Sequence, residues 1–253
     1  MERNIYLGID LGSSSIKIVV IEQPNTPHIV TLHNQSLNFG NLDGSRNSPL
    51  FYEENVEEII TILCTGLKNI PLDLQKQIKS IGVCGQMHGI LFWSNKHSQN
   101  SVFPLPELSE NNVSPLYTWQ DQRCSPEFLK QLPKAESQQT TSTGFGIATS
   151  FWLLQRNPEV FEKQGFFCNF LIFLYSTADF FRFESAGTIH DFVVALLCDL
   201  DQPVMSPQNA ASWGYFNSVT NTWNVDMYHV TNTCTCTSNI KSILEWLFLI
   251  FSA

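Results

Sequence analysis

The sequence predicts an α/β domain in which a mixed β-sheet is flanked by helices. Three features favour this fold: two apolar runs joined by a glycine-led turn, a third extended run after a turn with two prolines, and an amphipathic stretch that leads into another apolar run. Runs rich in Val and Ile are typical of strands, whereas apolar residues that recur every three or four positions are typical of a helix. A content of 43% hydrophobic residues and a mean hydropathy of -0.05 indicate a globular protein with an apolar core.

The first two strands are expected at residues 5–11 and 15–22, which are apolar and rich in β-branched side chains. Only three residues, beginning with Gly12, separate them, so we predict a β-hairpin with glycine in its turn. After the proline-bounded turn, residues 29–37 are expected to form a third strand.

Residues 53–69 show the period of a helix, because their apolar side chains fall on one face. Residues 78–84 return to a strand-like pattern, and residues 90–93 do so again. Hairpin, third strand, helix and strand is the element order of a ribonuclease H-like domain, the unit shared by actin, heat-shock chaperone ATPases and sugar kinases. We therefore expect this domain at the start of the chain.

Further along the chain, residues 128–152 contain helical pieces that are broken at Pro133 and around Gly144. Thr188 and Asp191 have the spacing of a capping box, with Thr188 as the N-cap, and predict a helix that runs to Cys198.

Charge and composition exclude several classes of partner. Lys and Arg together number 14 against 23 Asp and Glu, a net charge of -9. No basic stripe is visible, which argues against nucleic acid and anionic membrane surfaces as partners. A bilayer span needs roughly 18 uninterrupted apolar residues. Polar residues interrupt the apolar stretch at 166–183, and the stretch at 246–251 is too short, so we expect no membrane span.

The seven cysteines are an odd number at scattered positions, and only Cys234 and Cys236 lie close together. One C-x-C pair without further ligands is weak support for a metal site, so we expect free thiols in a reducing compartment. Because the N-terminal residues have no apolar signal-peptide region, a cytoplasmic location is expected.

The first candidate site lies around the predicted hairpin. Asp10, near the end of the first strand, can hold Mg²⁺, usually through water. The glycine lets the backbone approach phosphate groups, and the serine hydroxyls and backbone N–H groups can donate to them. The alternative is an ordinary hairpin with one solvated aspartate. The candidate phosphate-binding residues are Asp10, Gly12, Ser13, Ser14, Ser15 and Lys17.

Two further motifs suit a polyol. In Gly85-Gln86-Met87-His88-Gly89 the side chains of Gln86 and His88 can hydrogen-bond hydroxyl groups; the alternative is a histidine satisfied within a turn. In the string from Thr118 to Arg123, the indole of Trp119 can cover the apolar face of a sugar while Asp121 bonds its hydroxyls. The alternative there is a buried Trp beside an Asp–Arg pair.

Taken in this order, the three motifs resemble those of the FGGY family of carbohydrate kinases. The strings at residues 143–154, 187–191 and 208–217 also match, and they resemble the sedoheptulokinases of that family more than xylulokinases or glycerol kinases. The resemblance covers about residues 5–163 and 186–226.

The resemblance implies an enzyme that uses ATP and Mg²⁺ to phosphorylate a primary hydroxyl of a ketose such as sedoheptulose. It implies that Asp10 lies beside the Mg–nucleotide, that Gly12 to Ser15 form the first phosphate loop, and that Lys17 reaches the phosphates. It also implies a sugar pocket. Its lining is expected from Gln86, Met87, His88 and Trp119, with Asp121 close by.

The sequence departs from the family pattern in three places. An aromatic insertion is expected at about residues 164–185, inside an N-terminal kinase domain at residues 1–227. Residues 228–253 form a divergent tail that we expect not to belong to the fold. No Gly-Asp-x-Gln string follows Asn217. That string carries the general base in relatives, so no catalytic residue is assigned and little turnover is expected.

Two other functions stay open. The chain can be a non-catalytic fragment that binds sugar or a partner without turnover. An ATPase of the actin or chaperone type is a more distant reading, because the Met-His and Trp-Gln-Asp motifs disfavour it.

Overall fold

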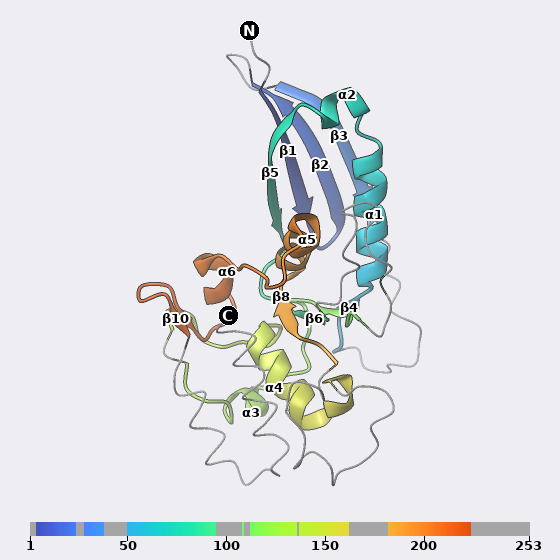
Figure 1. Ribbon diagram of the computed structural model, residues 1–253. Coiled ribbons are helices and arrows are strands. Elements are labelled where there is room, and N and C mark those ends of the chain that lie inside the picture. The colour runs from blue at the N-terminus through green and yellow to red at the C-terminus, as the bar shows by residue number, and fades with distance from the viewer. Residues whose placement is uncertain are drawn as a thin grey trace.

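The computed structural model in Figure 1 describes residues 4–23, 28–37, 50–94, 108, 112–135, 137–161 and 182–223. The predicted turn at 24–27, most of the expected aromatic insertion, and the tail with Cys234 and Cys236 lie outside these residues. The strands are β1 (Ile5–Leu11), β2 (Ser15–Glu22), β3 (His28–Ser36), β4 (Glu53–Glu54), β5 (Ile78–Gly85), β6 (Leu91–Trp93), β7 (Leu116–Tyr117), β8 (Ser185–Gly187), β9 (Phe216–Asn217) and β10 (Thr222–Trp223). The helices are α1 (Val56–Lys68), α2 (Leu72–Gln75), α3 (Pro126–Leu129), α4 (Gly146–Arg156), α5 (Ile189–Cys198) and α6 (Pro207–Ala211), with one 3-10 turn, η1 (Pro158–Phe161).

A four-stranded mixed sheet in the order β3-β2-β1-β5 is the centre of the fold (Figure 1). Strands β1, β2 and β3 pair antiparallel, and β5 runs parallel to β1. The predicted hairpin is confirmed: Gly12 N–H donates to Ser15 O over 3.1 Å and closes the turn between β1 and β2. Gly12 does not have a positive φ. Glycine instead allows the backbone to approach Ser15 closely, because a Cβ at this position would lie 3.0 Å from Ser15 O.

Alternate residues of β1 are buried, and α1 and α5 contribute to the same apolar cluster as those residues. Helix α1 begins at Val56 rather than at residue 53, because the two residues before its N-cap form β4 and pair with β7. The N-cap is Asn55, whose side chain accepts hydrogen bonds from the N–H groups of Glu57 and Glu58. Such a cap stabilises a helix by about 1 kcal/mol.

The predicted strand at residues 90–93 is present as β6, but it does not join the main sheet. It pairs antiparallel with β8 from much later in the chain. In Figure 1 these strands lie below the four-stranded sheet and beside α4. A second buried apolar cluster surrounds them, with Phe92, Phe161, Phe183 and Trp213 among its fully buried members.

The residues on either side of segment 162–181 meet. Arg182 N–H donates to Phe161 O over 2.9 Å, and the next residue, Phe183, is fully buried. Residues 182–185, the end of the expected insertion, therefore pack with the rest of the described domain.

Two simpler expectations also concern the described part of the chain. Its four cysteines, Cys64, Cys84, Cys124 and Cys198, are free thiols. Among the described residues, every helix is too short or too polar to cross a bilayer.

Candidate functional site

The phosphate-loop candidates lie at the tip of the first hairpin. Lys17 Nζ lies 3.1 Å from Asp10 Oδ2, and both side chains are partly exposed. Cys84 Sγ, on the neighbouring strand, lies 3.7 Å from Asp10 Oδ1. Leu37 N–H donates to Ser14 O over 3.0 Å and fixes the turn to the chain that follows β3. The ends of β1 and β2 therefore present a carboxylate and an ammonium group beside an anchored turn.

The ends of β1 and β5 join this hairpin to Gly85–Gly89, which we call the acceptor segment after the sugar-binding role that the resemblance predicts for it. Gln86 N–H donates to Leu11 O over 2.9 Å. Gly85 is in close contact there, because a Cβ on it would lie 2.9 Å from Leu11 O. The structure thus brings the two motifs together, although 72 residues lie between Gly12 and Gly85 in the sequence.

Sequence reasoning missed Glu54, which lies against the acceptor segment. Gln86 Nε2 donates to Glu54 Oε2 over 2.9 Å, and Glu54 is only 8% exposed. Burial raises the pKa of Glu54 to about 7; the hydrogen bond from Gln86 lowers it and the charge of Glu58 adds to the rise. The signal in the sequence was weak, since Glu53-Glu54 looked like the solvated start of a helix.

His88 has the left-handed backbone conformation in the acceptor segment, with φ of 71°. The glycines of this segment do not have a positive φ. Glycine is needed at position 89 because a Cβ there would lie 2.7 Å from Tyr117 O. Non-glycine residues adopt positive φ at a cost of order 1 kcal/mol, and such strain is found where surrounding contacts over-determine a position. Met87, between Gln86 and His88, is half-buried.

Four contacts hold His88 in this conformation. Its Nδ1 lies 2.7 Å from Ser212 O, and its backbone N–H donates to Ser212 Oγ over 3.3 Å. Its carbonyl accepts from Gly146 N–H over 2.8 Å. Its ring stacks on Phe145 with centroids 4.6 Å apart and an interplanar angle of 10°.

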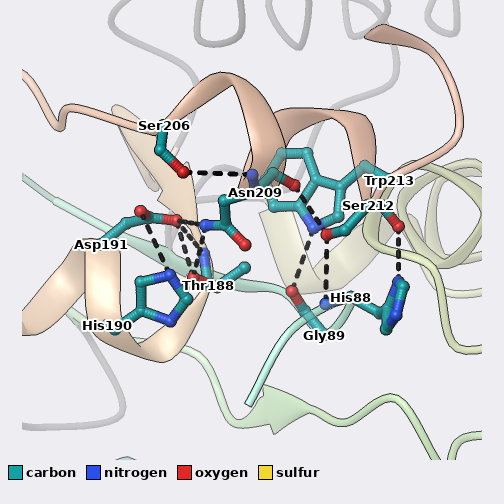
Figure 2. Close-up of polar contacts among 9 residues, drawn as sticks. All are labelled: His88, Gly89, Thr188, His190, Asp191, Ser206, Asn209, Ser212 and Trp213. Carbon is teal, nitrogen blue, oxygen red and sulfur yellow. Dashed lines mark hydrogen bonds and ion pairs between the residues drawn. The ribbon is translucent and has the colours of Figure 1, made fainter. Parts of the chain in front are cut away.

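Figure 2 shows a polar network behind His88 that involves the end of α6. Asn209 Nδ2 donates to Thr188 Oγ1 over 3.0 Å and to Asp191 Oδ2 over 2.7 Å. Thr188 N–H also donates to Asp191 Oδ2, over 2.9 Å, so the predicted capping box of α5 is present. Burial raises the pKa of Asp191, against the lowering effects of His190, Thr188 and Asn209. Trp213 Nε1 donates to Gly89 O and ties the same segment to the acceptor segment.

Trp119 is 47% exposed, so the alternative of a buried indole is wrong, although the Asp–Arg pair that the same alternative expected is present as Asp121 and Arg123. It lines an open cavity of about 680 Å³. Gly144, with φ of 76°, lies directly against the Trp119 backbone. The cavity residues are Leu50, Tyr52, Trp119, Gln120, Asp121, Gln122, Cys124, Ser125, Pro126, Ser142 and Thr143. Trp119 and Asp121 are the only predicted sugar-pocket residues among them.

The expected role of Asp121 as a sugar contact needs correction. Asp121 is fully buried, and both carboxylate oxygens are occupied. Oδ1 accepts from Arg123 N–H and Nε over 3.0 and 2.8 Å, and Oδ2 accepts from Tyr52 N–H and Arg123 Nη2 over 3.0 and 2.8 Å. Arg123 Nη2 also donates to Glu53 Oε1 over 2.8 Å. Asp121 therefore supports the loop below Trp119 and offers a sugar no free acceptor.

The sequence of the chain matches known proteins along most of its length. A profile described as "FGGY family of carbohydrate kinases, N-terminal domain" matches residues 5–238. Sedoheptulokinase from Mus musculus is 40% identical over 231 residues, which are 88% of this chain and 44% of that protein. Sedoheptulokinase from Homo sapiens is 39% identical over 233 residues, with the same coverage. Xylulose kinase from Klebsiella pneumoniae is 27% identical over 165 residues, 63% of this chain and 30% of that protein. The chain thus spans less than half the length of these relatives.

Solved structures of two kinases have a fold similar to that of this chain. Xylulose kinase from Bifidobacterium adolescentis superposes with a TM-score of 0.63 at 11% identity, covering 98% of this chain and 46% of that one. Plasmodium falciparum glycerol kinase with ADP superposes with a TM-score of 0.60 at 18% identity, covering 95% and 42%. At such identities the likeness concerns the fold, and it confirms the predicted α/β class with its mixed sheet.

Proposed function

The chain belongs to the FGGY family of carbohydrate kinases, and from this premise we propose that it carries the phosphate loop and the acceptor pocket of an ATP-dependent ketose kinase. Sedoheptulose is the proposed acceptor. The identity of 40% to a sedoheptulokinase over 88% of the chain favours this ketose over xylulose, since the xylulose kinase matches at 27% over 63%.

The observation that carries the proposal is the junction between Gln86 and Leu11. Phosphoryl transfer needs the phosphate donor and the acceptor hydroxyl to be held close together, because catalysis is mostly positioning and charge stabilisation. The backbone hydrogen bond from Gln86 to Leu11 attaches the acceptor segment to the strand that ends in the phosphate loop. This junction supports one site with a phosphate side and a sugar side.

On the phosphate side, the residues fit a magnesium nucleotide. Mg²⁺ is usually bound by one or two carboxylates, several waters and substrate phosphates, and Asp10 offers a partly exposed carboxylate of this kind. When bound, the ion would neutralise charge on the phosphate oxygens. Ser13, Ser14 and Ser15 would donate to these oxygens, and Lys17 would move from Asp10 to the phosphates.

On the sugar side, we assign four residues. Trp119 is about half exposed and would cover the apolar face of the ketose. Gln86, Met87 and His88 would line the hydroxyl-bearing side. The proposed N-terminal domain is residues 1–227, and residues 228–253 are proposed as a divergent tail.

Calorimetric titration of the purified chain with sedoheptulose, xylulose and glycerol tests the acceptor assignment. We expect sedoheptulose to bind most tightly, and equal or tighter binding of xylulose or glycerol contradicts it. Measurement of sedoheptulose-dependent ADP release separates the two functions. ADP release identifies a kinase, whereas binding without release identifies a sugar-binding form without turnover.

A further inference from the structure

The imidazole of His88 has one nitrogen that is already committed to the protein. Nδ1 lies 2.7 Å from the backbone oxygen of Ser212. A carbonyl oxygen can only accept a hydrogen bond, so this contact is favourable only when Nδ1 carries the hydrogen. In a neutral imidazole the other nitrogen, Nε2, is then an acceptor. Among the described residues no hydrogen-bond partner is recorded for Nε2, and the residue is half-buried.

The carbonyl of Ser212 is itself fixed by the end of α6, which we call the α6 clamp (Asn209–Ser212). Ser212 is fully buried, and its Oγ donates to Asn209 O over 2.6 Å. Asn209 in turn is bonded to Thr188 and Asp191 at the start of α5, as Figure 2 shows. The carbonyl therefore cannot turn away from Nδ1 without breaking buried hydrogen bonds, which cost about 1–3 kcal/mol each when a partner is lost.

The ring is also prevented from turning. Phe145 stacks on one face of the ring, with the ring centroids 4.6 Å apart. The backbone N–H of His88 is bonded to Ser212 Oγ, and its backbone carbonyl is bonded to Gly146 N–H. A ring flip would place a carbon opposite Ser212 O and leave that oxygen without its donor. The positive φ of His88 is a strained conformation that this arrangement maintains.

We propose that the α6 clamp is a positioning element that holds His88 as the Nδ1–H tautomer, so that Nε2 accepts a hydrogen bond from a hydroxyl group of the bound sugar. The identity of the ligand rests on the proposed function; the tautomer does not. Ser212 and Asn209 act through His88 and do not touch the sugar.

The tautomer is measured directly by long-range ¹H–¹⁵N correlation spectra of the chain with ¹⁵N-labelled histidine, at about pH 8.5, where histidine side chains in general are neutral. The chain has six histidines, and the His88→Gln variant assigns the signal. We expect the pattern of a protonated Nδ1 and an unprotonated Nε2. The opposite pattern, or a mixture in the wild-type chain, overturns the proposal.

The positioning role is tested with Ser212→Ala, which removes the hydroxyl and keeps the backbone carbonyl. We expect a mixture of the two tautomers in this variant. The matched control is Gln208→Ala, an exposed position on the same helix, which should keep the wild-type pattern. If Ser212→Ala folds and keeps a single Nδ1–H tautomer, the clamp does not position His88; if it does not fold, the wild-type spectrum still decides the tautomer.

Addition of sedoheptulose separates this inference from the proposed function. We expect the Nε2 resonance of His88 to shift and Ser212→Ala to weaken binding about fivefold, the value of one lost hydrogen bond of about 1 kcal/mol. Calorimetric binding without any shift at Nε2 overturns the acceptor role of His88. If calorimetry shows no sedoheptulose binding, the acceptor assignment fails, and a single Nδ1–H tautomer in wild type that becomes a mixture in Ser212→Ala still upholds the clamp.

Discussion

The side-chain amide of Gln86 donates to the carboxyl group of Glu54 over 2.9 Å at the point where the start of α1 meets the acceptor segment. Glu54 Oε1 and Gln86 Oε1, the other oxygens of the pair, are enclosed and have no hydrogen-bond partner within the described residues. An enclosed carboxylate with one donor is costly, which is the physical reason that burial raises the pKa of Glu54 to about 7.

This pair predicts a specific dependence of stability on pH. Because the pKa of Glu54 is about 7 in the folded chain and 4.5 is its ordinary value, the folded state retains a proton that the unfolded state releases between those values. The contribution of Glu54 to stability is therefore full below about pH 4.5 and falls as pH rises towards 7. Glu54→Gln cannot ionise, so we expect it to gain about 1–3 kcal/mol of unfolding free energy over wild type when pH is raised from 5 to 8.

Urea unfolding of both proteins at pH 5 and pH 8 measures this difference. The control is Glu57→Gln, an exposed position in the first turn of α1, three residues after Glu54, which should show the wild-type dependence. A parallel response of Glu54→Gln and Glu57→Gln would refute the assignment to Glu54.

Gly144 is predicted to accept no side chain. Its φ is 76°, and a Cβ would lie against Trp119 O and 2.7 Å from the Trp119 carbonyl carbon. Gly144→Ala should therefore lower the unfolding free energy by about 2 kcal/mol or more, through positive-φ strain and displacement of the Trp119 backbone. The control is Gly82→Ala in β5, where a Cβ meets nothing within 4 Å. We expect that variant to unfold within about 0.5 kcal/mol of wild type in the same denaturant titration.

Trp119→Ala should weaken sedoheptulose binding without unfolding the chain. The indole is about half exposed and lines the open cavity, so its loss removes contact with ligand more than contact with the core. The expected loss is about 1–3 kcal/mol, or about 5- to 150-fold in Kd. Calorimetry compares it with Leu72→Ala, another exposed apolar side chain, on α2. Unchanged affinity in Trp119→Ala would remove this residue from the proposed pocket.

The ion pairs of Arg123 and Lys17 allow a buried pair to be compared with a partly exposed one. It bonds Asp121 and Glu53 inside the domain and lies 4.7 Å from the ring centres of Phe51 and Tyr117. Arg123→Met leaves two buried carboxylates without their cation, and we expect a loss of about 3–5 kcal/mol in unfolding free energy. Lys17→Met breaks the partly exposed pair with Asp10 and should cost less than about 1 kcal/mol. Similar losses in both variants would show that Arg123 is not the anchor described.

The local pattern of the sequence predicted the main sheet well. Strands β1 and β2 have the predicted bounds, β5 is one residue longer at its end, and β3 begins and ends one residue earlier than predicted. Alternating or continuous apolar runs bounded by glycine and proline specify the individual strands. Only β1, β2 and β3 follow one another directly; β5 pairs with β1 across a long stretch of chain, and the expected ribonuclease H-like element order predicted that pairing. Strand β6 was found, but its partner β8 lies about 90 residues away, and no local pattern encodes such a pairing.

The site was predictable in its motifs and less so in its contacts. The spacing around Asp10, Gln86, His88 and Trp119 suggested a phosphate side and a sugar side. The burial of Asp121 was not predictable, because it depends on Arg123 lying over three aromatic rings from distant elements. Glu54 was missed for the same reason: its unusual pKa arises from enclosure, which the sequence does not display.

The residues that flank segment 162–181, Phe161 and Arg182, are joined by one backbone hydrogen bond, and Phe183 continues directly into the core. A connection whose two ends are already fixed side by side affects folding mainly through the entropy of loop closure. That cost grows by only about 0.6 kcal/mol for each doubling of length. The packing of Phe161 and Phe183 does not depend on how many residues lie between them. We therefore expect this position to tolerate a change in the number of residues between Phe161 and Arg182 at little cost in stability.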